Sequence, residues 1–190
     1  DVESGSAEWG DYDNDGDLDI LLTGATGYSP NENPICKIYS NDGYNIFTEV
    51  SDLSLTGIYN GTAIWGDFDN DGDLDILMTG KSNPNPVSKI FKNNGDGTFN
   101  DQIEILPIGV EYSDAAWGDY DNDGDLDVIL AGYSRLYKDE ITIIYRNDGN
   151  DQFTALTNFV ITGVSYASVH WGDYDNDGDL DLLLTGSSVS

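Results

Sequence analysis

One acidic stretch recurs four times in this chain of 190 residues, and its spacing limits the folds that the chain can adopt. The stretch reads Trp-Gly-Asp-Tyr/Phe-Asp-Asn-Asp-Gly-Asp-Leu-Asp, is followed by an apolar run, and begins at Trp9, Trp65, Trp117 and Trp171. The intervals between these tryptophans are 56, 52 and 54 residues. A period of this length indicates a propeller blade or a comparable repeat unit that packs against its neighbours.

The segments between the acidic stretches have the pattern of short strands. Their apolar runs are rich in Ile, Leu, Val and aromatic residues and are broken by Gly, Asn, Asp and Pro every eight to twelve residues. In the second repeat the expected strands are roughly 62–66, 74–79, 88–92 and 98–105. Further expected strands are 37–39, 47–50, 141–146 and 152–156, and Asn/Asp-Gly turns at 41–43, 93–97 and 147–149 close the hairpins. The sequence therefore predicts an all-β fold of β-propeller blades, each a four-stranded antiparallel meander, with about three and a half blades in this chain.

The repeats predict one propeller region over residues 1–190. Its repeats are approximately 1–56, 57–108, 109–162 and a truncated 163–190. Because a closed ring normally needs at least four blades, we expect open edges, and hence either a fragment of a larger ring or a self-associating half. The first residue is not Met, which favours a processed or excised product.

The acidic stretch has the spacing of a calcium loop. Asp11, Asp13, Asp15 and Asp19 stand at positions 1, 3, 5 and 9, and Gly16 permits a sharp turn that presents the carbonyl of Asp17 at position 7. A hard divalent cation that takes about six to eight oxygens matches this supply, whereas zinc or copper would require imidazole or thiolate. We therefore predict about four Ca²⁺ sites, one per repeat. The predicted ligand residues are Asp11, Asp13, Asp15, Asp17, Asp19, Asp67, Asp69, Asp71, Asp73, Asp75, Asp119, Asp121, Asp123, Asp125, Asp127, Asp173, Asp175, Asp177, Asp179 and Asp181.

The alternative is an ordinary turn, because Asp-Asn-Asp-Gly is also a common turn sequence. Four copies favour the metal, and a cation would offset the repulsion among five carboxylates within nine residues. In such a loop we expect the side chains of Asn14 and Asp17 to face solvent and Leu18 to anchor the loop in the core.

The net charge of −29 sets limits on partners and location. The four loops supply 20 of the 36 acidic residues, and so acidic a surface argues against binding to nucleic acid or to an anionic membrane. The sequence contains no run of about 18 apolar residues, so we expect no membrane insertion. Calcium sites of millimolar affinity would be filled outside the cell and empty in the cytosol, so we expect an extracellular or cell-surface location.

The repeated motif resembles the FG-GAP/VCBS-type repeat of integrin α-subunit propellers, some fungal lectins and many bacterial secreted proteins. The resemblance implies a propeller, usually of seven blades, with calcium held between the first and second strands of a blade. Every repeat here carries the loop, whereas integrins carry it in only some blades.

Catalysis finds little support in the sequence. His170 is the only histidine, and no nucleophile–base pair or Gly-rich phosphate loop is evident, so we predict that the chain is not an enzyme. The tryptophans could stack on sugars, but their fixed place before each loop favours packing between strands. The segments 25–36, 81–87 and 133–140 differ in length and composition and, with Tyr112 and Tyr166, are expected on the face opposite the metal loops. They are either recognition loops or drifting surface loops.

These observations predict a secreted or cell-surface, calcium-stabilised binding or adhesion module that recognises an extracellular protein or glycan. The alternative is a non-catalytic propeller part of a larger secreted carbohydrate-active enzyme.

Overall fold

The computed structural model describes residues 1–27, 32–44, 46–102 and 106–188. Within these ranges the chain forms strands and no helix, so it contains no helical segment that is long and apolar enough to cross a membrane.

The strands are grouped into successive antiparallel sheets. The first sheet contains β1 (Ala7–Gly10), β2 (Asp19–Thr26), β3 (Asn33–Asn41) and β4 (Phe47–Glu49). The second contains β5 (Tyr59–Gly66), β6 (Asp75–Ser82), β7 (Asn85–Asn93) and β8 (Phe99–Gln102). The third contains β9 (Glu111–Gly118), β10 (Asp127–Ser134), β11 (Asp139–Asn147) and β12 (Phe153–Ala155). A fourth sheet pairs β13 (Ser165–Gly172) with β14 (Asp181–Ser187). Each sheet follows chain order, so the all-β prediction of about three and a half blades is confirmed. We call the sheets blades 1 to 4.

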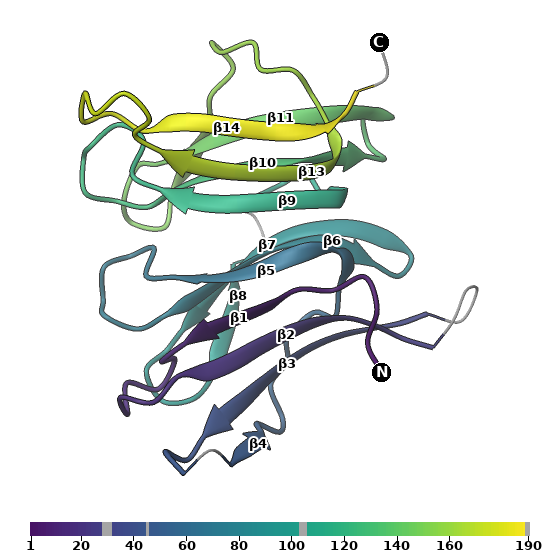
Figure 1. The fold of residues 1–190 in the computed structure, drawn as a ribbon, viewed down its shortest axis with the longest axis vertical. Helices are drawn as coiled ribbons and strands as arrows, with labels where there is room; N and C mark the ends of the chain where they lie inside the picture. The colour runs from purple at the N-terminus through teal and green to yellow at the C-terminus, as the bar shows by residue number, and fades with distance from the viewer. Residues whose placement is uncertain (28–31, 45, 103–105, 189–190) are drawn as a thin grey trace.

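The blades follow one another along the long axis of the molecule, with β1–β4 at the bottom and β9–β14 at the top (Figure 1). The first strands β1, β5, β9 and β13 contact one another in sequence. The acidic loops join the first and second strands of every blade, so they all emerge at the same end of the sheets.

The hydrophobic core lies between consecutive blades. Ile76 and Met78 on β6 pack toward blade 1, whereas the intervening Leu77 packs toward blade 3. This alternation follows from the two-residue period of a strand, and both faces of the blade are buried. A single blade therefore depends on its neighbours for its core, as expected of a repeat array.

In blades 2 to 4 a tryptophan covers a glycine of the preceding blade. A Cβ atom on Gly10 would lie 2.5 Å from Cδ1 of Trp65, and Gly66 and Gly118 have the same relation to Trp117 and Trp171. The tryptophans also stack on the aromatic residue that follows the glycine, with ring centroids 6.1 to 6.4 Å apart. These three tryptophans pack between blades, as the sequence favoured.

The connections between second and third strands are shorter than expected. Pairing continues from Lys81 with Pro86 to Ser82 with Asn85, and leaves only Asn83 and Pro84 as the turn. The same ladder extends to Thr26 with Asn33 in blade 1 and to Ser134 with Asp139 in blade 3. Pro and Asn made the segments in blades 1 and 2 look like loops, whereas backbone pairing continues into them. Of the strand expected over 98–105, residues 103–105 lie outside the described part.

Candidate metal centres

Each acidic loop is held in shape by its first aspartate. The two carboxylate oxygens of Asp11 accept the N–H groups of Asp15 and Gly16, both at 3.0 Å, and Asp15 Oδ1 accepts the N–H of Asp17 at 2.9 Å. The other three loops repeat these bonds within about 0.1 Å. The turn requires a positive φ at Asn14 (60°) and at Gly16 (94°), a conformation that Asn tolerates better than most residues and that Gly adopts freely.

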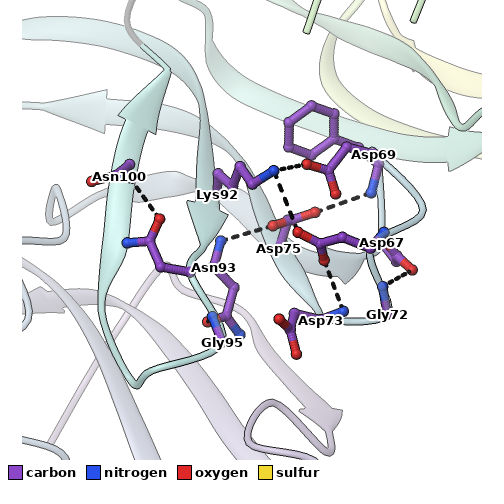
Figure 2. Close-up of polar contacts among 12 residues, drawn as sticks. Asp67, Asp69, Gly72, Asp73, Asp75, Lys92, Asn93, Gly95 and Asn100 are labelled. Carbon is purple, nitrogen blue, oxygen red and sulfur yellow. Dashed lines mark hydrogen bonds and ion pairs between the residues drawn. The ribbon is translucent and has the colours of Figure 1, made fainter. Parts of the chain in front are cut away.

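The last aspartate of the loop lies at the start of the second strand. Asp75 is fully buried, and its carboxylate accepts the N–H of Phe68 at 3.1 Å and the N–H of Asn93 at 2.8 Å (Figure 2). Asp19 and Asp127 are equally buried and make the equivalent bonds. Burial raises the pKa of Asp75 to about 7 and that of Asp127 to about 6, although the backbone N–H groups oppose this shift. The pKa of Asp19 is raised for the same reason.

Carboxylate oxygens converge in all four loops. One oxygen from each of three aspartates lies within 4.8 Å of the others in four groups: Asp11, Asp13 and Asp15; Asp67, Asp69 and Asp71; Asp119, Asp121 and Asp127; and Asp173, Asp175 and Asp181. Burial, then the adjacent carboxylates, raises the pKa of Asp13 and of Asp121. These sets of hard oxygen donors could hold a divalent metal ion.

One oxygen in blade 2 supports this fit directly. Asp69 Oδ1 is buried and has no hydrogen-bond partner among the described residues. A buried carboxylate oxygen without a donor is costly, and a cation in the loop would satisfy it.

The side chains at positions 4 and 7 connect neighbouring blades. Asn14 Nδ2 donates to Asp73 Oδ1 at 2.8 Å and points at the carbonyl of Gly72 at 3.4 Å. Asn14 is exposed, as expected, but its side chain is also bonded to the next blade, which was not expected. Asn70 and Asn122 make the same pair of contacts with the loop that follows. The signal for this role was the identical asparagine in all four copies, because a solvated position would be free to vary.

Two further features of the loops were not foreseen. Asn93, on the third strand, donates from Nδ2 to the carbonyls of Tyr12 at 2.9 Å and Leu74 at 3.2 Å, so it ties the loop of blade 1 to that of blade 2. Asn147 repeats this between blades 2 and 3. Leu18, expected to anchor the first loop, is 54% exposed, because no described segment covers that side of blade 1.

The second loop differs from the others in one basic residue. The Lys92 ammonium contacts the carboxylate of Asp69 and lies 3.3 Å from Asp71 Oδ2 (Figure 2). The equivalent position is Ser40 in blade 1 and Arg146 in blade 3, where the guanidinium Nε donates to Asp148 at 2.7 Å.

Stacked four-stranded meanders with an acidic loop between their first two strands define a protein of the propeller-repeat class. The FG-GAP-like repeat family model matches this chain over residues 11–78, 67–130 and 128–184. The chain belongs to this family. No curated protein matches the chain.

Proposed function

We propose that this chain is a calcium-stabilised, non-catalytic propeller module that acts outside the cell or at its surface by binding a partner. The observation that carries the calcium proposal is the fourfold convergence of aspartate oxygens, each set on a loop that is hydrogen-bonded to a neighbouring blade. The ion would be held by side chains at positions 1, 3, 5 and 9 and by the carbonyl at position 7. It would neutralise carboxylates that now repel one another.

Chelation and re-addition test the calcium proposal. Metal is first removed from the chain with EDTA. Its thermal unfolding is then followed by circular dichroism in about 2 mM EDTA, in about 2 mM CaCl₂ and in about 2 mM MgCl₂. Calcium should raise the melting temperature more than magnesium, since magnesium prefers fewer carboxylates and keeps more of its water. Equal melting curves in all three conditions would refute a stabilising role for calcium.

A partner-binding face is supported at the ends of the sheets away from the acidic loops. Ser4, Asn60, Tyr112 and Tyr166 begin or precede the first strands and all have φ between 49° and 55°. Positive φ is costly for tyrosine, and such strain is found most often at functional positions. The rings of Tyr112 and Tyr166 stack with centroids 4.6 Å apart, and Tyr166 remains 70% exposed.

Polar groups lie beside this tyrosine pair. Arg135 forms a bidentate ion pair with the buried Glu111, at 2.7 and 3.0 Å, and also donates to the carbonyl of Pro84 at 2.9 Å. An exposed aromatic ring next to fixed hydrogen-bonding groups suits the apolar face and hydroxyls of a sugar, so between the two expected partners we favour a glycan.

A glycan array tests this choice with wild-type chain and two variants. Tyr166→Ala should lose binding, whereas Tyr44→Ala should keep it, because Tyr44 is also largely exposed but lies on the turn between β3 and β4, at the opposite end of the sheets. Binding that survives Tyr166→Ala would refute this face, and an array without any bound glycan would turn the search to protein partners. If the chain is instead a non-catalytic part of a larger secreted carbohydrate-active enzyme, a catalytic domain should adjoin it in the gene.

The two end faces of the blade stack, one on blade 1 and one on blade 4, offer a further partner surface. Trp9 is 59% exposed and would fit over a glycine like Gly172, where an added Cβ would meet nothing within 4 Å. Tyr174 is 81% exposed and occupies the place of the tyrosine on which a following tryptophan stacks. We propose that these faces accept another blade of the same kind, from a second copy or from the rest of a larger propeller. Sedimentation of the free chain as a compact monomer at all concentrations would exclude the second copy.

A further inference from the structure

We infer that Lys92 is a resident cation of the second acidic loop and makes it the weakest of the four calcium sites. This inference rests on the proposed calcium function and adds that the four sites are unequal. It starts from the ammonium group, which contacts Asp69 (Figure 2) and lies 3.3 Å from Asp71 Oδ2. Both aspartates belong to the set whose oxygens converge in blade 2.

Lys92 is held in this position by the strand that carries it. Its side chain is only 27% exposed, and the next residue, Asn93, is fixed by bonds to Asp75 and to the carbonyls of Tyr12 and Leu74. The backbone therefore aims the lysine stem at the loop, and withdrawal of the ammonium would require a new path for a largely buried stem.

In the other described loops no lysine or arginine forms an ion pair with a loop aspartate. Blade 1 has Ser40 at this position, and Arg146 in blade 3 is turned to Asp148 on its own hairpin. Blade 4 has no third strand among the described residues. Identical aspartate loops are thus placed in different electrostatic surroundings. An ammonium contacts two aspartates of the second loop, whereas the Arg146 guanidinium acts on Asp121 of the third loop without forming an ion pair with it.

The size of the effect follows from Coulomb repulsion. A single positive charge about 4 to 5 Å from a divalent ion raises its free energy by about 2 kcal/mol even in a water-like dielectric, which corresponds to about 30-fold weaker binding. Ligand competition acts in the same direction, because the ammonium already contacts Asp69 Oδ2 and lies 3.3 Å from Asp71 Oδ2. We expect the second site to bind about 10- to 30-fold more weakly than the mean of the others.

The same contact predicts what happens at low calcium. As calcium is removed, the second loop should empty first, yet Lys92 remains to compensate Asp69 and Asp71. The second loop joins its neighbours on both sides, since Asp73 accepts from Asn14 and Asn70 donates to Asp125. Lys92 would therefore keep the middle of the blade stack connected when the ions are gone.

The test is a calcium titration of the whole 190-residue chain followed by ¹H–¹⁵N NMR. The loop glycine N–H of each site donates to the first aspartate of its own loop, so its largest response should follow the filling of that site. The four reporters are Gly16, Gly72, Gly124 and Gly178. In the wild-type chain Gly72 should be the last to respond, at about 10- to 30-fold higher free calcium.

Two variants and a control complete the test. Lys92→Ser places the blade 1 residue in blade 2 and should bring Gly72 into the range of the other glycines, whereas Lys92→Arg keeps the charge and should leave Gly72 late. Lys89→Ser is the matched control, because Lys89 lies on the same strand, pairs with Asp101 at 2.5 Å and is on the other face of the sheet. It should change nothing at the loops.

The outcomes separate the two proposals. If all four glycines respond together in the wild-type chain, or if Lys92→Ser leaves Gly72 late, the role of Lys92 is refuted while calcium binding stands. If no loop glycine responds in any variant, the calcium proposal itself fails. Should Lys92→Ser not fold, Ser40→Lys provides the reciprocal measurement, in which Gly16 should become late.

Discussion

Gly66→Ala tests the close contact on which the stacking of blades depends. Gly66 ends β5 beneath the indole of Trp117, and a Cβ atom there would lie 2.5 Å from Cδ1 and 2.6 Å from Nε1 of that ring. The indole cannot easily lift away, because it is stacked parallel to Phe68 with ring centroids 6.3 Å apart. An added methyl group must therefore displace an aromatic pair at the junction of blades 2 and 3.

The expected magnitude is the difference between two opposing effects. Alanine restricts the unfolded chain and fits a strand better than glycine, which alone would stabilise the protein by about 0.5–1 kcal/mol. Overpacking by one carbon in a closely packed interface costs about 1–3 kcal/mol. The two ranges leave a difference of about 0–2.5 kcal/mol, so we expect Gly66→Ala to lower the free energy of unfolding by about 1 kcal/mol.

Gly172→Ala is the matched control. Gly172 ends β13 in the same motif, but an added Cβ would meet nothing within 4 Å. Urea unfolding followed by circular dichroism should show a lower midpoint for Gly66→Ala and an unchanged or slightly higher one for Gly172→Ala. Equal midpoints for the two variants would show that the tryptophan does not need the glycine, and would refute this account of the junction.

Three other predictions concern the loops and the one thiol. Asn70→Ala removes the contacts of this side chain with Asp125 and with the carbonyl of Gly124 in the following loop, and should lower the free energy of urea unfolding by about 1 kcal/mol. The control is Asn176→Ala, because Asn176 has nearly the same positive φ but no following blade among the described residues. The pKa values of Asp75 and Asp127 are raised to about 7 and about 6, so without metal the folded state binds protons more tightly than the unfolded state. In EDTA the melting temperature should therefore fall as the pH rises from about 4 to about 7. The increase in melting temperature on adding calcium should be larger at pH 7.5 than at pH 5. A melting temperature that rises over this interval in EDTA would contradict those pKa values. Cys36 is partly buried, and burial raises the pKa of its thiol to about 12, so little thiolate is present at pH 8. Mass spectrometry should therefore find slow alkylation by iodoacetamide at pH 8 until urea is added, and rapid labelling of the folded chain would contradict the raised pKa.

The blades and loops could be predicted from the sequence because their signals are local. The period of 52 to 56 residues, the Asn/Asp-Gly turns and the spacing of the aspartates all lie within one repeat. The ends of the second and third strands were missed because backbone pairing tolerates the Pro and Asn residues that suggested loops, as at Lys81 with Pro86.

Contacts between repeats could not be derived in this way. Asn14 and its acceptor Asp73 are 59 residues apart, and nothing in either loop alone identifies the other as its partner. Lys92 was missed for the same reason, since it reaches the loop from a strand 23 residues away. Local pattern fixes which residues form a loop, whereas the register between strands and blades decides which charges meet there.

The same distinction explains how metal sites could stabilise a stack of blades that each lack a core of their own. Stability in such an array is the sum of what each blade contributes and of what each junction contributes. Here one short segment contributes to both, because Asp67 shapes the loop within blade 2 while Asn70, three residues later, donates to the loop of blade 3. An ion that orders the loop therefore also fixes the donor of the junction. Calcium bound in one blade should strengthen the contact with the next, and the effect of each ion should depend on whether the following blade is folded.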